Sequence, residues 1–349
     1  MPKNKTPSQT GFTYIELLIA LSIGLIIIAA VLQVLYHNAG SVKRQSAHAD
    51  LQDTMVFSIN FVKKQIRKAG MGAKANHQHS GHILKQDTVY GGIVMTAPNQ
   101  AFGSIDNAVS TNLHGIRLGN AAVPKRLLSR SAVGSSNVLQ QKSDQLTILY
   151  LMPNSGHYDC QGRGIPKGYY VIERYFVRKD KNATALACAS SNFKVVAKRM
   201  EDITQWVDIS VYTKPNGKTV KSYFSGRGSV IIPNVDYFRV MYGVSDMDND
   251  SQANEDAVNT IEYIAANNAE QAQGFDELNK RIVSVRFGLL MHSQINQVNA
   301  FKKQLPHPQD RFKVLDKQNL MLNTKQDMGN FNRQVLESTI LLRNARAIY

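Results

Sequence analysis

Hydrophobic residues run almost without interruption from Leu17 to Tyr36, close to the start of the chain. About 20 apolar residues in a helix span the hydrocarbon core of a bilayer, so this segment is long enough to cross a membrane. Between Phe12 and Tyr36 the only carboxylate is Glu16. A carboxylate in a membrane-spanning helix costs about 2.5–3.5 kcal/mol, and less near the helix end. The pattern therefore predicts a membrane helix whose acid has a functional partner.

Further along, the apolar positions recur at helical spacing, which places them on one face of a helix. They are Leu51, Met55, Ile59, Val62, Ile66 and Ala69. We expect one helix from Phe12 to Ala69, roughly 85 Å long at 1.5 Å per residue. Gly70 and Gly72 predict its end. Two separate helices hinged at Gly40 are the alternative.

Beyond residue 72, short apolar runs are bounded by turn residues, which is typical of β-strands. Most of the runs alternate apolar and polar positions, so we expect half-buried antiparallel strands. They span residues 145–151, 169–178, 185–188, 193–196, 207–212, 230–232, 237–244, 282–291 and 338–343. The run Pro215-Asn216-Gly217 predicts a tight turn. We expect residues 73–112 to form loops and short strands, residues 256–280 to be partly helical, and residues 296–330 to form an extended loop or an insertion.

Composition adds a basic balance and a small number of cysteines. The net charge of the 349 residues is +15. Such a charge suits nucleic acid, an anionic membrane surface or acidic partners; the basic residues are scattered, so a merely solvated basic surface is the alternative. The two cysteines, Cys160 and Cys188, can pair if this part of the chain is exported. That loop would contribute about 3–4 kcal/mol; two free buried thiols are the alternative.

No catalytic fingerprint is present, and two motifs suggest metals. The sequence lacks the Gly-x-Ser-x-Gly, His-Glu-x-x-His, P-loop and Rossmann patterns, so we do not expect an enzyme. A His-x-His-x-x-His run, at His77, His79 and His82, suits a polar loop better than a metal site, which needs a further ligand.

An acidic turn is the stronger metal candidate. Asp246, Asp248 and Asp250 alternate along the chain, as the carboxylates of calcium loops do. The EF-hand pattern requires glycine where Ser251 stands and an acid where Ala257 stands, so the turn is not an EF-hand. Calcium is a possible ligand, and a solvated acidic turn is the alternative.

The start of the chain resembles a known processing signal. A short polar leader ends in Gly11, Phe12 follows, and an acid stands four positions later at Glu16. The run Gly-Phe-Thr-x-Ile-Glu-Leu-Leu-Ile-Ala-Leu is similar to the type III signal of type IV prepilins and pseudopilins. The resemblance implies that prepilin peptidase cuts between Gly11 and Phe12 on the cytoplasmic side and methylates the new amine of Phe12.

Two other interpretations of the N-terminal segment explain less of it. A secretory signal peptide also begins with basic residues, here Lys3 and Lys5, but its apolar core has about 7–15 residues and precedes a small-x-small site. A plain single-pass anchor explains the length but not the acid. The positive-inside rule selects no orientation, because Lys43 and Arg44 follow the span much as the two lysines precede it. A cytoplasmic N-terminus therefore rests on the resemblance.

The resemblance also supplies a partner for Glu16. After cleavage, Phe12 carries a free cationic amine in the membrane region. A charge pair is far stronger in that low dielectric than in water, and breaking it leaves a lone buried charge. The resemblance implies a pair between subunits, which would fix the register of stacked helices. A pair within one chain is the alternative.

Later segments occur in one order and together are similar to the PilW family of type IV pilus minor pilins. They are Lys-Gln-Ile-Arg-Lys-Ala-Gly (64–70), Gly-Tyr-Tyr-Val-Ile-Glu-Arg-Tyr (168–175), Val-Met-Tyr-Gly-Val-Ser-Asp (240–246), Ile-Val-Ser-Val-Arg-Phe-Gly-Leu-Leu (282–290) and Leu-Arg-Asn (342–344). The acidic turn after Tyr-Gly-Val departs from the family, because it lacks glycine.

This resemblance implies an α+β, pilin-like fold, in which a long N-terminal helix packs on a mainly antiparallel β globular region. The implied parts are a leader (1–11), the transmembrane half of the helix (12–36), its amphipathic periplasmic half (37–70) and a β-rich globular domain (71–349). The chain would be a single-pass inner-membrane protein with a cytoplasmic N-terminus, and would later reach the pilus at the cell surface.

The implied function is the initiation or assembly of type IV pili in a priming or tip complex, with roles in twitching motility and adhesion. The implied partners are prepilin peptidase, other minor pilins, the major pilin, the inner-membrane assembly platform and a tip adhesin. A type II secretion pseudopilin and a DNA-uptake subunit that uses the basic surface are the alternatives.

Overall fold

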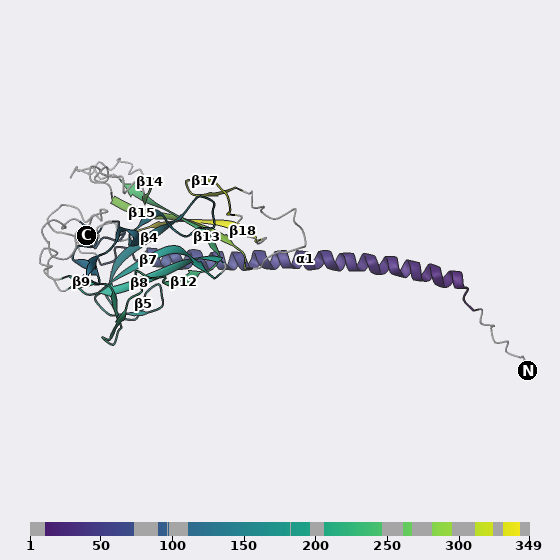
Figure 1. Cartoon of the computed structure of the whole chain (residues 1–349), viewed down its shortest axis with the longest axis horizontal. Helices are drawn as coiled ribbons and strands as arrows, with labels where there is room; N and C mark the ends of the chain where they lie inside the picture. The colour runs from purple at the N-terminus through teal and green to yellow at the C-terminus, as the bar shows by residue number, and fades with distance from the viewer. Residues whose placement is uncertain are drawn as a thin grey trace, which may run out of the picture.

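The computed structural model describes residues 11–72, 90–95, 97, 111–181, 183–195, 206–245, 261–266, 281–294, 311–323 and 331–342. One helix, α1 (Tyr14–Ile66), forms a long rod whose first half stands clear of a β-rich region that packs against its second half (Figure 1). The helix is continuous through Gly40, so the prediction of a single helix is confirmed and the hinged alternative is wrong. The helix spacing of the apolar stripe and the absence of proline within it account for this continuity.

Two antiparallel sheets make up most of the β-rich region. The five-stranded sheet has the order β12 (Ser229–Ile232), β8 (Ala183–Phe193), β7 (Tyr169–Asp180), β4 (Ser143–Met152) and β3 (Arg130–Gly134). The four-stranded sheet has the order β14 (Ile261–Ala265), β13 (Val235–Ser245), β15 (Arg281–His292) and β18 (Arg333–Leu341). The predicted α+β class with a mainly antiparallel β-region is confirmed.

Smaller elements cover these sheets. A three-stranded sheet has the order β2 (Ala121–Ala122), β1 (Ile116–Leu118) and β9 (Val207–Asp208), with β1 and β9 parallel. Three hairpins are β5 (His157–Tyr158) with β6 (Gly164–Ile165), β10 (Val211–Thr213) with β11 (Thr219–Lys221), and β16 (Phe312–Val314) with β17 (Lys317–Leu320). A short 3-10 helix, η1, spans Lys125–Leu127. The predicted turn joins β10 to β11, where the Gly217 amide donates to the Lys214 carbonyl over 2.9 Å.

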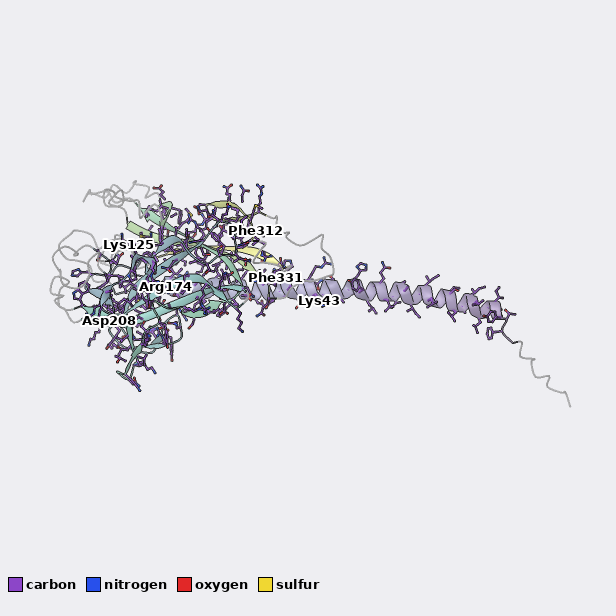
Figure 2. All side chains as sticks on the ribbon, viewed as in Figure 1. Lys43, Lys125, Arg174, Asp208, Phe312 and Phe331 are labelled. Carbon is purple, nitrogen blue, oxygen red and sulfur yellow. A yellow bond between two sulfur atoms is a disulfide. The ribbon has the colours of Figure 1, made fainter. Side chains whose placement is uncertain are left out.

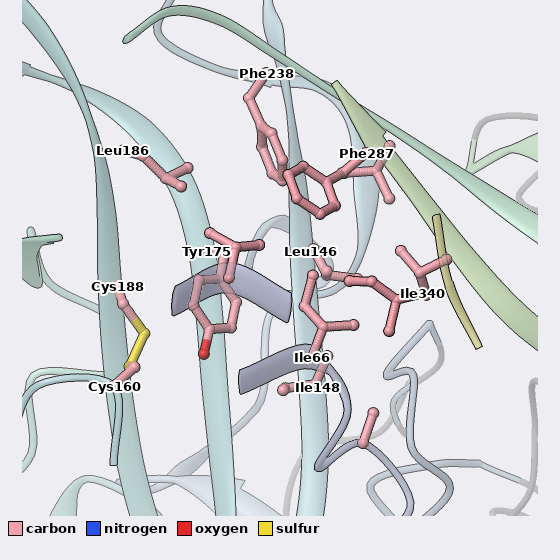
Figure 3. Packing of buried hydrophobic residues seen from close by; sticks show 14 of the residues in the cluster. Ile66, Leu146, Ile148, Cys160, Tyr175, Leu186, Cys188, Phe238, Phe287 and Ile340 are labelled. Carbon is pink, nitrogen blue, oxygen red and sulfur yellow. A yellow bond between two sulfur atoms is a disulfide. The ribbon is translucent and has the colours of Figure 1, made fainter. Parts of the chain in front are cut away.

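The main hydrophobic core lies where α1 meets both large sheets. Figure 3 shows Ile66 of α1 beside Ile148 of β4, with Phe238 and Phe287 of the four-stranded sheet across the same cluster. Gly92 passes so close to the end of α1 that a Cβ there would lie 2.7 Å from the Ala69 carbonyl carbon. Only glycine permits this approach of two backbones.

The central strands of the five-stranded sheet are buried on both faces, which corrects the prediction of half-buried strands. Leu146 and Ile148 of β4 face the main core, whereas Leu149 faces a second cluster on the opposite side. This second cluster is built on Tyr90, Val94, Leu113, Ile116, Leu127 and Phe224, among others. Segments that precede the sheet in sequence, and the segment between β8 and β12, therefore cover the face that the alternating pattern left to solvent.

In four places the described residues differ from the local predictions. The runs at 185–188 and 193–196 belong to or border one strand, β8, because Ser190, Ser191 and Asn192 between them are buried and hydrogen-bonded. The run at 207–212 divides into β9 and β10. Within 256–280, residues 261–265 form strand β14, because they pair with β13, and the rest of the predicted helical segment beyond residue 266 lies outside the described residues. Within 296–330, the described residues 311–323 contain the hairpin of β16 and β17 rather than an extended loop, and this hairpin covers Leu290 of β15.

Candidate assembly site

The chain enters α1 through an extended, exposed segment. Gly11, Phe12 and Thr13 precede the helix, and the Phe12 side chain is 91% exposed. A Cβ added at Gly11 would meet no atom within 4 Å. The chain's own packing therefore places no demand on this glycine. Exposed, non-helical backbone is where proteases act most readily, so the predicted cleavage position is accessible in the unprocessed chain.

Thr13 and Glu16 form a capping box at the start of α1. The Thr13 amide and hydroxyl each donate to Glu16 Oε2 over 3.0 Å, and the Glu16 amide donates to Thr13 Oγ1 over 3.4 Å. The backbone N–H groups of Thr13 and Glu16, which have no acceptor within the helix, therefore find hydrogen-bond acceptors in these two side chains. The signature Thr-x-x-Glu, which predicts this cap, is present in the sequence, and the interpretation of Glu16 as a charge partner alone missed it.

The first half of α1 has no partner within the described part of the chain. Its large apolar side chains are exposed, from 46% at Leu18 to 79% at Tyr14. Figure 2 shows them standing out on all sides of the helix beyond Lys43. Among the described residues, α1 is the one helix whose length and composition suit a membrane span. A helix that is apolar all round is stable where lipid or other helices surround it.

The second half of α1 is fixed to the β-rich region. Leu51, Val62 and Ile66 of the predicted stripe are at most 1% exposed, and Met55 and Ile59 are partly buried against the same core. Beyond the helix, the Gly70 amide donates to the Leu149 carbonyl of β4 over 2.9 Å. The predicted amphipathic face is therefore confirmed, and it makes α1 an integral part of the globular core.

A buried polar cluster joins this helix end to the disulfide. Cys160 and Cys188 are bonded, with 6.2 Å between their Cα atoms, so the predicted pair is confirmed and the free-thiol alternative is wrong. Glu173 Oε1 accepts from the Cys160 amide over 2.7 Å and from the Tyr150 hydroxyl over 2.9 Å, and Tyr175 donates to its Oε2. Burial raises the pKa of Glu173, and the nearby Lys68 ammonium opposes that rise.

Two buried charge clusters were not predicted. Arg239 of β13 contacts Asp144 of β4 over 3.0 Å and Asp316 of the hairpin of β16 and β17 over 2.6 Å. Asp236 of β13 is the second centre. Its carboxylate contacts the Arg333 guanidinium over 3.0 Å, the His292 ring over 3.1 Å and the Asn137 amide over 3.0 Å.

These clusters cross-link the layers. The residues of the Arg239–Asp144 pair are 95 positions apart, and those of the Arg333–Asp236 pair are 97 apart. No local spacing brings such residues together. The charges are surrounded by hydrogen-bond partners, as buried charges must be, and they hold the two large sheets and the hairpin together.

The metal candidates lie outside the described residues. Asp246, Asp248 and Asp250 follow the last residue of β13, and the three histidines lie in the segment after α1. Within the described part of the chain, no group of three or more His, Cys, Asp or Glu residues is arranged to hold a metal ion. Calcium binding by the acidic turn stays a prediction.

Comparison with known proteins supplies two family matches. Residues 6–32 match the prokaryotic N-terminal methylation motif, which covers the predicted cleavage position and the start of the apolar helix. Residues 174–344 match the family of type IV pilus-assembly protein W, which covers the four-stranded sheet and, of the five-stranded sheet, most of β7 together with β8 and β12. No curated protein matches the chain.

Among solved structures, the type IV-like pilin TTHA1219 from Thermus thermophilus is similar in part. The match covers 60% of this chain and 83% of that chain, at 11% sequence identity and a TM-score of 0.28. A TM-score this low does not show a shared arrangement of the strands.

The methylation motif and the long apolar helix, joined to an antiparallel β-region, define a membrane-anchored type IV pilin-like protein. Within this class, the match of residues 174–344 supports a minor pilin of the PilW family of type IV pilus-assembly proteins. Proteins of this family and fold are structural pilins rather than enzymes. Pilins of this kind associate with other pilins and with the peptidase that acts on the methylation motif.

Proposed function

We propose that this chain is a minor pilin that takes part in initiating and assembling type IV pili. Prepilin peptidase cuts it between Gly11 and Phe12 and methylates the new Phe12 amine. One observation carries the proposal: an apolar helix, capped at its start and exposed all round, is joined without a break to a folded β-rich region. Such a helix needs external partners along its whole first half.

The orientation follows from the same proposal. The N-terminus faces the cytoplasm, the first half of α1 spans the inner membrane, and the β-rich region is periplasmic until the subunit enters the pilus. The disulfide between Cys160 and Cys188 supports this placement, because disulfides persist in oxidising compartments such as the periplasm.

Glu16 acts between subunits in this proposal. In the unprocessed chain its carboxylate accepts two hydrogen bonds from Thr13. One of its oxygens, Oε2, receives both bonds, which leaves Oε1 for another donor. Cleavage converts the nitrogen of Phe12 from an amide into a methylated cationic amine. The amine of a neighbouring subunit can then pair with Glu16 and set the register of adjacent helices.

A place at the filament tip or in a priming complex suits the size of the β-rich region. Nine strands form the two large sheets, and further sheets and hairpins surround them. This bulk would collide along a tightly packed helical filament but is accommodated at its end. The partners there are other minor pilins, the major pilin, the assembly platform and a tip adhesin, and the cellular outcomes are twitching motility and adhesion.

The test separates the charge of Glu16 from its capping role. Gln also completes a capping box, so Glu16→Gln removes the charge and keeps the cap, whereas Thr13→Val removes the hydroxyl cap and keeps the charge. In a deletion strain, we expect Glu16→Gln protein to be inserted and cleaved normally but to restore few surface pili. Thr13→Val should restore piliation. Full piliation by Glu16→Gln would contradict the intersubunit pair.

The deletion strain also separates the pilus from the alternatives. Loss of surface pili and twitching supports the proposal. Retention of exoproteins in the periplasm with normal pili would indicate a type II secretion pseudopilin. Normal pili with lost DNA uptake would indicate an uptake subunit.

A further inference from the structure

Four arginines line one cleft in the β-rich region, and none of the described residues that line it belongs to α1. The cleft has a volume of about 410 Å³ and lies between η1, strands β3, β4 and β7, and residues 225–227. Its basic side chains are Arg126, Arg174, Arg178 and Arg227, and none of the described residues that line it is acidic. Figure 2 labels Arg174 within the β-rich region.

Arg174 is a buried cation among neutral partners. It is 5% exposed, and its guanidinium donates to the Phe224 carbonyl over 3.1 Å, the Gly226 carbonyl over 2.7 Å and Gln145 Oε1 over 3.0 Å. The guanidinium also stacks 3.8 Å from the ring centre of Phe176. Burial, together with the charge of Arg126, lowers the pKa of Arg174 to about 10. A guanidinium group carries five N–H donors, and the three hydrogen bonds of Arg174 leave others that an anion can accept from.

The other three arginines leave donors unused as well. Arg178 contacts Asp180 over 3.2 Å at Nη1, but its buried Nε has no hydrogen-bond partner. Arg227 donates from Nη2 to the Lys179 carbonyl over 3.0 Å. The exposed guanidinium of Arg126 makes no hydrogen bond or ion pair with the described residues. Among the described residues, Asp180 is the carboxylate that pairs with one of these four guanidinium groups, and no acid lines the cleft itself.

We propose that this arginine cleft binds phosphate groups. An uncompensated cluster of cations, one of them buried, is unfavourable in the free protein, and an oxyanion that accepts several N–H donors relieves it. Guanidinium groups match the geometry of phosphate oxygens and bind them in a bidentate manner. The cleft is larger than a single phosphate requires, so it suits a ligand that carries several phosphate groups. The site is separate from Glu16 and does not depend on the proposed role in assembly.

The experiment uses the full chain in detergent micelles and three probes. Pyrophosphate represents a free phosphate compound, a single-stranded 12-residue oligonucleotide represents a phosphodiester polymer, and polyglutamate tests carboxylates. The test variant is Arg126→Gln with Arg227→Gln, both on exposed positions at the cleft. The control is Lys214→Gln with Lys218→Gln, which makes the same charge change on an exposed hairpin turn outside the cleft. Arg174→Gln is left out of the first test, because its buried hydrogen bonds also support the fold.

The expected result is that pyrophosphate, the oligonucleotide or both bind the unaltered chain. The cleft variant should then weaken binding about tenfold or more, and the control less than threefold. The probe that binds identifies the source of the phosphate. Oligonucleotide binding should also fall steeply with salt. The proposal is overturned if no phosphate probe binds, if both double variants weaken binding equally, or if polyglutamate binds as tightly as the phosphate probes.

Discussion

The two halves of α1 share one continuous helix but depend on different surroundings. The first half is apolar on every side and makes no packing contact with the described β-rich region, whereas the second half buries Leu51, Val62 and Ile66 in the main core. The same helical geometry therefore serves two purposes. The second half stabilises the fold of its own chain, and the first half provides a surface for lipid and for other subunits.

A pair of matched substitutions tests this difference most strongly. Ile66→Ala removes a fully buried side chain, and we expect it to lower the free energy of unfolding of the β-rich region by about 4 kcal/mol. Ile26→Ala makes the same chemical change at a position that is 70% exposed, and should leave that free energy unchanged. Denaturant unfolding of the full chain in detergent, followed by near-ultraviolet circular dichroism, measures both. If Ile26→Ala lowered the free energy of unfolding as much as Ile66→Ala, the two halves of α1 would not differ in the way described.

A smaller effect is expected from the buried charges that hold the β-rich region together. Asp236 is fully buried, which by itself raises its pKa, but the contacts with His292 and Arg333 outweigh burial and hold the pKa below its usual 3.8. The stability that this carboxylate contributes is therefore present above pH 3.8 and is lost as the pH falls through the lower folded-state pKa. Asp236→Asn should cost about 3 kcal/mol at neutral pH and make the loss of stability in acid less steep.

The control for this second prediction is an exposed ion pair. Arg286 and Glu337 lie 3.2 Å apart and are 41% and 31% exposed. Glu337→Gln should cost less than about 1 kcal/mol. Unfolding curves measured at a series of pH values separate the two variants, and an unchanged acid profile in Asp236→Asn would refute the role given to Asp236.

The sequence predicted features that depend on neighbouring residues. The span of α1 and its buried stripe could be predicted, because the length of the apolar segment and the helical spacing of its apolar residues indicate where the helix runs and which face it buries. Most long strands were predicted for the same reason. Strand β14 was expected to be partly helical, because the alanines and polar residues of 256–280 favour a helix; pairing with β13 overrides that preference. The central strands were expected to be half exposed, and only distant segments such as Tyr90 and Phe224 bury their second face.

The candidate sites divide in the same way. The Gly11, Phe12 and Glu16 positions were predicted from one contiguous motif, and the cap by Thr13 was available from the same residues. The disulfide was predicted because only two cysteines are present. The charge clusters around Asp236 and Arg239, and the arginine cleft, bring together residues from several strands. Their partners are set by the topology of the sheets, which spacing along the chain does not reveal.

The central claim is that the first half of α1 becomes an assembly surface only after cleavage creates the Phe12 amine. Intact-mass spectrometry of the protein recovered from membranes or sheared pili tests it directly. The account predicts a chain that begins at Phe12, lacks residues 1–11 and carries one added methyl group. Recovery of the protein from pili with residues 1–11 still attached would contradict it.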